Sequence, residues 1–408
     1  MDVLCIKCKG KGLCGQSCKI LNKFINNAPK PRLHFSGKSA PEIFIGRIGY
    51  PHINSGILVP PKNDNVSNFA TAEEWSANNF SVANVLRLRS QLVYGKSKTN
   101  IKLKAKGYRL KALLQELALS SKPVSTEIFL KKKPTMEFTS DSIFRPMINP
   151  APIKKAILEE NPKVPKKVDY LTSDYDTKAT TAIKELYASN IKVDHLQRLL
   201  SVGLLGTRTK RKMVPTRWSI TATDDTISKQ QLEKIRYFPE INQVTLFSGN
   251  FIGNYIEAIL LPGHFSFEAI EAWLPSSTYN SLPTTHYPLP TISQDYETFN
   301  GRKKYAFEVT GGYYAMRLPT TEYLTKIKRQ AIVLIFREIK PEYYAPLGVG
   351  IVREATRRAF STTPKYFENT DDALKNIQTR IAVPIEQIKQ KSWTLKNYGK
   401  QKTLKQFL

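Results

Sequence analysis

Apolar residues recur with two different periods along this chain, so both helices and strands are expected. Steps of three and four residues, typical of one helix face, run through residues 73–93, 176–188, 193–205 and 353–360. A short helix is also predicted over 266–273. Apolar runs with strand character occur at 42–50, 56–59, 218–222, 243–247, 254–260 and 304–309. The mixture predicts an α+β body and leaves its topology open.

Some segments lack a clear period. Seven prolines between Lys122 and Pro165 predict extended or looped backbone rather than a long regular element. Helix and strand compete over 325–339, where β-branched and helix-forming residues are mixed. The segment Lys389–Leu408 holds six lysines and no acidic residue, which predicts a flexible basic tail.

Charge is the clearest bulk property. Lysine and arginine number 62 against 34 aspartates and glutamates, for a formal net charge of +28. Such an excess attracts polyanions and favours DNA binding, although a surface that simply uses lysine heavily would give the same count. No apolar run approaches the roughly 20 residues of a membrane span. The first residues are cysteines and lysines rather than an apolar leader, so a cytoplasmic, nucleoid-associated protein is expected.

All four cysteines lie within the first eighteen residues, as Cys5, Cys8, Cys14 and Cys18. Four thiolates at this spacing can converge on one tetrahedral Zn²⁺ ion if the backbone turns tightly. The intervening glycines allow such turns. A structural zinc module over residues 1–25 is therefore predicted, with an iron–sulfur cluster as the alternative metal centre.

A short motif near Leu408 predicts a protein partner. Gln401, Leu404, Phe407 and Leu408 match the clamp-interacting (PIP) pattern of a glutamine, an aliphatic residue three positions on, and an aromatic end. A short 3₁₀ turn brings positions three apart onto one side, so Leu404 and Phe407 can form an apolar plug. The expected partner is the DNA sliding clamp (PCNA).

A set of strings in the central and C-terminal parts is similar to one protein family. The strings are Arg211-Lys212-Met213-Val214-Pro215-Thr216-Arg217-Trp218, Gly301-Arg302, Gly311-Gly312-Tyr313-Tyr314, Lys328-Arg329-Gln330 and Gly348-Val349-Gly350-Ile351-Val352-Arg353-Glu354. With the cysteines and the clamp motif, their order resembles the archaeal Nre family of clamp-binding DNA repair proteins. The resemblance implies a role in responding to DNA damage and names no reaction.

The resemblance also implies a domain plan. After the cysteine module, residues 26–280 would form an Nre N-terminal-type region and residues 281–385 a C-terminal-type region. A flexible basic tail with the clamp motif would occupy residues 386–408.

Polar residues within these strings are candidates for a ligand pocket. They are Arg217, Asp224, Asp225, Arg302, Tyr313, Tyr314 and Arg353. The arginines could hold phosphate oxygens, the aspartates a divalent metal ion, and the tyrosines a base. Simpler roles compete with these. The aspartates follow the strand predicted at 218–222, where they would cap a helix running to Ile235, and the tyrosines could belong to the core.

A basic run provides a second candidate surface. Arg208, Lys210, Arg211 and Lys212 could contact DNA phosphates, or form an ordinary solvated loop. Three functions follow from the sequence: a clamp-recruited DNA repair factor, an enzyme that processes DNA ends, damaged bases or nucleotides, and a non-catalytic clamp-bound adaptor.

Overall fold

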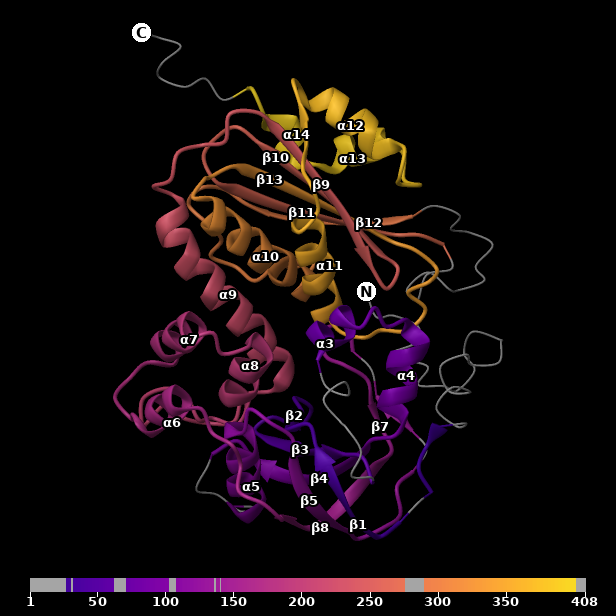
Figure 1. Ribbon diagram of the computed structural model, residues 1–408, viewed down its shortest axis with the longest axis vertical. Coiled ribbons are helices and arrows are strands. Elements are labelled where there is room, and N and C mark those ends of the chain that lie inside the picture. Colours follow the sequence, from indigo (N-terminus) through magenta and orange to yellow (C-terminus); the bar gives the residue numbers. More distant parts are fainter. Residues whose placement is uncertain are drawn as a thin grey trace. The chain divides into compact units, whose positions relative to one another are not determined.

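The computed structural model describes residues 27–30, 32–61, 71–102, 108–135, 137–139, 141–275 and 290–400. The chain divides into two compact units, here called unit 1 (Met1–Ile227 with Ala345–Gly350) and unit 2 (Ser228–Tyr344 with Ile351–Leu408). Each has its own six-stranded sheet, which confirms the α+β class (Figure 1). No described helix is long and apolar enough to cross a membrane.

The sheet of unit 1 has the strand order β1-β5-β8-β4-β3-β2, and its only parallel pair is β4 with β8. The strands are β1 (His34–Ser39), β2 (Glu42–Ile45), β3 (His52–Val59), β4 (Val93–Asn100), β5 (Val124–Leu130) and β8 (Pro150–Leu158). A two-stranded ribbon joins β6 (Phe138–Thr139) to β7 (Met147–Ile148). The strands predicted at 42–50 and 56–59 are confirmed, and they pair with each other as β2 and β3, although β2 ends at Ile45.

The extended backbone predicted between Lys122 and Pro165 is present, but the expectation that no long regular element lies there is wrong, because strands β5 and β8 do. Proline lacks a backbone donor but keeps its carbonyl acceptor. The carbonyls of Pro150 and Pro152 accept hydrogen bonds from the N–H groups of Thr135 and Lys131, at 3.2 and 2.8 Å. Pro150 and Pro152 can therefore lie in strand β8, because both of their carbonyl oxygens accept hydrogen bonds.

The helices of unit 1 are α3 (Ala72–Ala77), α4 (Val82–Ser90), α5 (Tyr108–Leu119), α6 (Lys166–Ser173), α7 (Ala179–Ala188) and α8 (Val193–Ser201). The single helix predicted at 73–93 is two helices. Asn79 takes a positive φ of 51°, and Ser81 begins a new helix with a capping box to Asn84. The helices predicted at 176–188 and 193–205 are confirmed as α7 and α8.

Helix α9 (Thr216–Ile235) contains the boundary between the two units. It replaces the strand predicted at 218–222 and the cap predicted at Asp224 and Asp225, so both predictions are wrong. Ile220 and its threonine neighbours favour a strand only by local propensity, which packing overrides. Both aspartates lie in the middle of this helix, where no N-cap is needed.

The sheet of unit 2 has the order β12-β11-β13-β10-β9-β14, and its only parallel pair is β11 with β13. The strands are β9 (Val244–Phe251), β10 (Asn254–Leu261), β11 (Ser266–Trp273), β12 (Thr291–Glu297), β13 (Ile332–Ile339) and β14 (Lys365–Phe367). The strands predicted at 243–247 and 254–260 are confirmed, and they pair as the antiparallel hairpin of β9 and β10.

Two predictions in unit 2 are wrong. Residues 266–273 form strand β11 rather than a helix. This strand is buried on both faces, so its sequence lacks the strict apolar–polar alternation that marks a half-buried strand. Residues 304–309 form a loop, and the edge strand lies earlier, at β12. Over 325–339, where the sequence was ambiguous, α10 ends at Ile327 and β13 begins at Ile332.

Helices cover both faces of this sheet. Figure 1 shows α10 (Gly311–Ile327) and α11 (Gly350–Phe360) on one face. The other face carries α12 (Thr370–Gln378), α13 (Ile385–Lys391) and α14 (Trp393–Asn397). The helix predicted at 353–360 is confirmed within α11.

The prediction of a flexible tail from residue 386 is wrong up to residue 400. Ile388 is buried against the sheet, with Ile385, Leu395 and Tyr398 packed around it. Widely spaced apolar residues between lysines are enough to seat two short helices when a sheet face is available. Residues 401–408 lie outside the described residues.

Candidate functional site

A cluster of buried charged side chains occupies one face of the unit 2 sheet. Arg317 of α10 donates two hydrogen bonds from Nη1 to the carboxylate of Glu297 on β12, at 3.0 and 2.8 Å. Both side chains are almost fully buried. Because an unpaired charge in such a place costs several kcal/mol, as an order of magnitude, this pair joins α10 firmly to the sheet edge.

Arg337 on β13 forms the second part of this cluster. Its Nε donates to Oδ1 of Asn254 at 2.9 Å, and its Nη1 donates to the carboxylate of Glu271 on β11. Burial raises the pKa of Glu271 above its ordinary value, and the nearby Arg337 offsets only part of this rise. Gly312 packs on the same carboxylate, since a Cβ at Gly312 would lie 2.3 Å from Oε1 of Glu271. The Gly311-Gly312 motif therefore permits the close approach of α10 to a buried acid.

Asp295 on β12 organises the loop that leads to α10. Its carboxylate accepts hydrogen bonds from the backbone N–H groups of Phe307, Glu308 and Val309, at 3.1, 2.9 and 2.8 Å. Arg302 donates a fourth from Nη2, at 2.8 Å. Arg302 also donates from Nη1 to the carbonyl of Tyr296 and from Nε to that of Lys304. This arginine, a candidate phosphate ligand by sequence, is engaged in holding its own loop.

Tyr313 and Tyr314 lie inside the core at the start of α10. The guanidinium carbon of Arg302 is 4.8 Å from the Tyr313 ring centroid, and that of Arg317 is 5.7 Å away. Burial raises the pKa of Tyr313 well above its ordinary value. The Tyr314 hydroxyl accepts from the backbone N–H of Ala306 at 3.1 Å. The structure thus brings Arg302, Tyr313 and Tyr314 together, as packed side chains rather than an open base-stacking surface.

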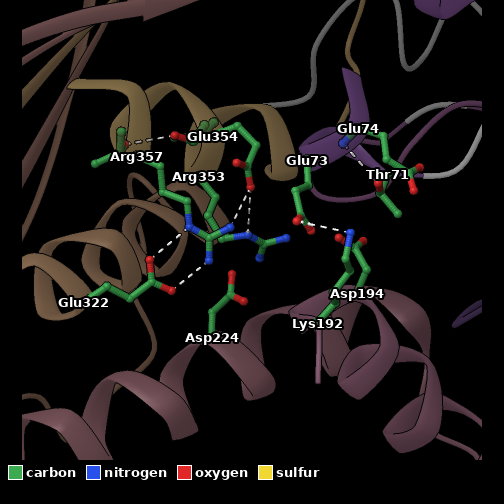
Figure 2. A network of polar contacts seen from close by, with 12 residues as sticks. Thr71, Glu73, Glu74, Lys192, Asp194, Asp224, Glu322, Arg353, Glu354 and Arg357 are labelled. Carbon is green, nitrogen blue, oxygen red and sulfur yellow. Dashed lines mark hydrogen bonds and ion pairs between the residues drawn. The ribbon is translucent and has the colours of Figure 1, made fainter. Parts of the chain in front are cut away.

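Arg353, the remaining candidate in unit 2, is buried on α11 with its Nε 3.9 Å from Oε1 of Glu354. Figure 2 shows the neighbouring Arg357, which donates to both carboxylate oxygens of Glu322 and to Glu354. These contacts join α11 to α10. Arg353 therefore lies beside an ionic connection between two helices.

Arg217, Asp224 and Asp225 belong to unit 1. Arg217 donates from Nη1 to both oxygens of Asp141, at 2.5 and 2.6 Å. The buried carboxylate of Asp224 accepts from the amide of Gln197 at 3.2 Å. Asp225 is half-buried on α9. Among the described residues, no group of three or more histidine, cysteine or acidic side chains is arranged to hold a metal ion.

The basic run in unit 1 divides into two kinds of residue. Arg208, Lys210 and Lys212 are exposed. Arg211 instead donates to the carbonyls of Gly206, Thr172 and Asp174, at 2.7, 2.6 and 2.5 Å. Its guanidinium carbon lies 4.3 Å from the ring centroid of Tyr175. Three of the four predicted DNA contacts are therefore available to a ligand, and Arg211 supports the loop.

Three buried glutamates were given no site role by the sequence reasoning. Glu257, Glu268 and Glu338 lie on the sheet face that carries α12–α14. Glu338 accepts from the backbone N–H groups of Ala382 and Val383, and Glu257 binds Arg380. The available signal was an acidic residue inside an apolar run, as in Ser266-Phe267-Glu268-Ala269-Ile270.

The remaining predicted sites lie outside the described residues. They are the cysteines Cys5, Cys8, Cys14 and Cys18, and the clamp-motif residues Gln401, Leu404, Phe407 and Leu408.

Two family models match this chain: "Archaeal Nre, N-terminal" over residues 13–280 and "Archaeal Nre, C-terminal" over residues 297–407. DNA repair protein NreB of Archaeoglobus fulgidus is 34% identical over 404 residues, which are 99% of this chain and 100% of that protein. NreA of the same organism is 36% identical over 385 residues, 93% of this chain and 94% of the relative. NreA of Haloferax volcanii is 33% identical over 362 residues, 87% and 85% of the two chains. No solved structure matches.

Proposed function

This chain belongs to the archaeal Nre family, and on that premise we propose that it is a DNA repair factor recruited to DNA by the sliding clamp (PCNA). The main support is the likeness to proteins named as DNA repair proteins over nearly the whole chain. The two matched regions, residues 13–280 and 297–407, extend over both compact units.

The clamp contact is assigned to Gln401, Leu404, Phe407 and Leu408. Leucine and phenylalanine side chains each contribute roughly 1.5–3 kcal/mol when buried. That is a large share of the ~8 kcal/mol of a micromolar complex. Gln401 can both donate and accept a hydrogen bond, and the lysines around it suit an acidic protein surface. Helix α14, which precedes the motif, is held on the sheet by hydrogen bonds to Glu268. The motif would therefore begin close to a helix whose position in unit 2 is fixed.

Calorimetric titration with the cognate clamp tests this assignment. Leu404→Ala combined with Phe407→Ala should weaken binding by about a hundredfold or more, in both the full chain and a peptide of residues 395–408. The matched control is Thr403→Ala with Gln406→Ala, which changes two positions that the motif leaves open. Equal affinity of the Leu404/Phe407 variant and the original chain would refute the assignment.

DNA contact is assigned to the exposed Arg208, Lys210 and Lys212, with the net charge of +28 as general support. Phosphate contacts of this kind bind all sequences and weaken as salt rises, because bound counterions are released.

A structural Zn²⁺ ion is assigned to Cys5, Cys8, Cys14 and Cys18. The donor set supports zinc, because four thiolates complete a tetrahedral site and leave no open coordination position. Lys7, Lys9 and Lys11 would offset the negative charge of such a centre.

A further inference from the structure

Aromatic side chains are exposed around the loop between β12 and α10. They are Tyr296, Phe299, Tyr305 and Phe307, and residues 296–307 are here called the aromatic loop. Tyr305 is 52% exposed and Phe307 is 87% exposed. All of these residues lie in unit 2. Tyr296 packs on Trp393 of α14, on one face of the sheet, whereas Tyr305 packs on Tyr314 of α10, on the other face. Tyr305 and Phe307, two positions apart and both more than half exposed, are therefore the rings that indicate a binding surface.

Hydrogen bonds to neighbouring side chains hold the backbone of the aromatic loop in place. Three consecutive N–H groups, starting at Phe307, bind the carboxylate of Asp295. Arg302 holds the carbonyls of Tyr296 and Lys304, and Tyr314 binds the N–H of Ala306. Because the backbone is ordered by buried partners, a ligand would not have to order it on binding, which favours affinity.

Three of the four rings, those of Tyr296, Phe299 and Tyr305, pack against other side chains. The ring of Tyr296 stacks on Trp393 with centroids 4.6 Å apart and an interplanar angle of 6°. Tyr305 lies 5.1 Å from Tyr314. The guanidinium carbon of Arg236 is 5.2 Å from the centroid of Phe299. These contacts set ring orientations while the outer parts of the side chains stay exposed.

Positive charge accompanies the rings. Lys303 and Lys304 are exposed, and neither forms an ion pair in the described part of the chain. The neighbouring Glu308 already has a cationic partner, because its carboxylate lies 3.1 Å from Nζ of Lys391. Rings that can stack on bases, next to cations that can contact phosphates, match the requirements of an unpaired strand.

We propose that the aromatic loop is a stacking platform for single-stranded DNA. Phe307 and Tyr305 take unpaired bases, and Lys303 and Lys304 contact the phosphates. Duplex DNA buries the faces of its bases, so it is a poor ligand for these rings. This inference rests on the proposed role in DNA repair and names the form of DNA that unit 2 recognises.

Fluorescence anisotropy with the full chain tests the platform, using a labelled 20-nucleotide oligothymidine and a labelled 20-base-pair duplex. Tyr305→Ala with Phe307→Ala should weaken binding of the single strand at least about tenfold. Binding of the duplex should change less than about twofold, since duplex contacts are mainly to phosphates. The matched control, Lys365→Gln with Tyr366→Ala, changes an exposed lysine and an exposed tyrosine on β14 of the same unit, and should leave both affinities unchanged.

Two further measurements separate stacking from charge. Replacing Lys303 and Lys304 with glutamine should reduce the salt slope for the single strand by about 1.4, from two lost phosphate contacts. A 2-aminopurine base within the strand should be quenched by the original chain. Phe307→Ala alone should reduce that quenching, and because Phe307 is so exposed this variant should keep the original melting temperature.

The inference is overturned if the Tyr305/Phe307 variant binds the single strand as tightly as the original chain. It is also overturned if that variant loses clamp affinity instead, because the loop would then be a protein contact. If the original chain binds the clamp but no single strand, the platform fails and the clamp assignment stands. If it binds neither clamp nor DNA, the proposed function fails as well.

Discussion

Glu268 is the residue by which the sheet of unit 2 holds the helix that precedes the clamp motif. It lies on β11, the strand next to the edge strand β12, with its side chain buried. Its carboxylate accepts hydrogen bonds from the backbone N–H groups of Trp393 and Thr394, at 2.7 and 2.8 Å, and from the hydroxyl of Ser392 at 2.7 Å. Glu268→Ala should therefore loosen α13 and α14 while the sheet remains folded.

The size of the effect follows from the groups left without an acceptor. Each buried donor that loses its partner costs about 1–3 kcal/mol. Part of this is offset, because a buried carboxylate no longer has to be desolvated. A net local destabilisation of about 3 kcal/mol corresponds to a roughly hundredfold rise in the population of the opened segment.

Amide hydrogen exchange, followed by mass spectrometry, measures this opening directly. Peptides from residues 385–400 should exchange roughly a hundred times faster in the Glu268→Ala variant, while peptides from α10 should be little changed. Glu386→Ala is the matched control, since it removes an exposed glutamate on α13 that pairs with the partly exposed side chain of Lys389. Unchanged protection of residues 385–400 in the Glu268→Ala variant would refute the anchoring role.

Three further predictions concern unit 1 and the metal site. Burial lowers the pKa of His195 to about 3, so below its unfolded pKa near 6.5 unfolding takes up a proton. Stability should fall by up to about 1.4 kcal/mol per pH unit from pH 6.5 towards 3, and urea titrations of the His195→Gln variant should show a shallower fall. Changing Arg208, Lys210 and Lys212 to glutamine should weaken DNA binding and flatten its salt slope at an unchanged melting temperature, whereas Arg211→Ala should lower the melting temperature. Metal analysis should find about one zinc per chain, lost in the Cys8→Ser/Cys14→Ser variant; an iron–sulfur absorption band in anaerobically prepared protein would contradict zinc.

The apolar pattern of the sequence correctly predicts the helices and strands that bury only one face. The hairpin of β9 and β10, the pairing of β2 with β3, and helices α7, α8 and α11 all show a clear apolar period. The errors fall where the period disappears. Strand β11 is buried on both faces, and α9 carries β-branched residues in a helix. In both cases tertiary packing determines whether the segment is a helix or a strand. The residues it packs against are distant in the sequence, so a local pattern does not show them.

The candidate ligand residues show the same limit. Glu297 and Arg317, or Glu271 and Arg337, are separated by 20 and 66 residues in the chain. A sequence shows the arginines without showing that each already has a carboxylate partner. Residue type selected Arg302 and Arg353 as candidate ligands in unit 2, but it did not predict the buried pairs of Arg317 with Glu297 and of Arg337 with Glu271.

Because these buried charges are paired with one another, ligand binding is expected on other, exposed surfaces of unit 2. The motifs Gly301-Arg302 and Gly311-Gly312-Tyr313-Tyr314 resemble a family and are rich in polar groups, yet their side chains mostly act on neighbouring backbone and buried acids. Their physical effect is to fix the aromatic loop. In the same way, Glu268 fixes α14. The buried polar residues of unit 2 thus position two exposed segments, so substitutions in the buried cluster should affect ligand binding through the geometry of those segments rather than through a lost contact.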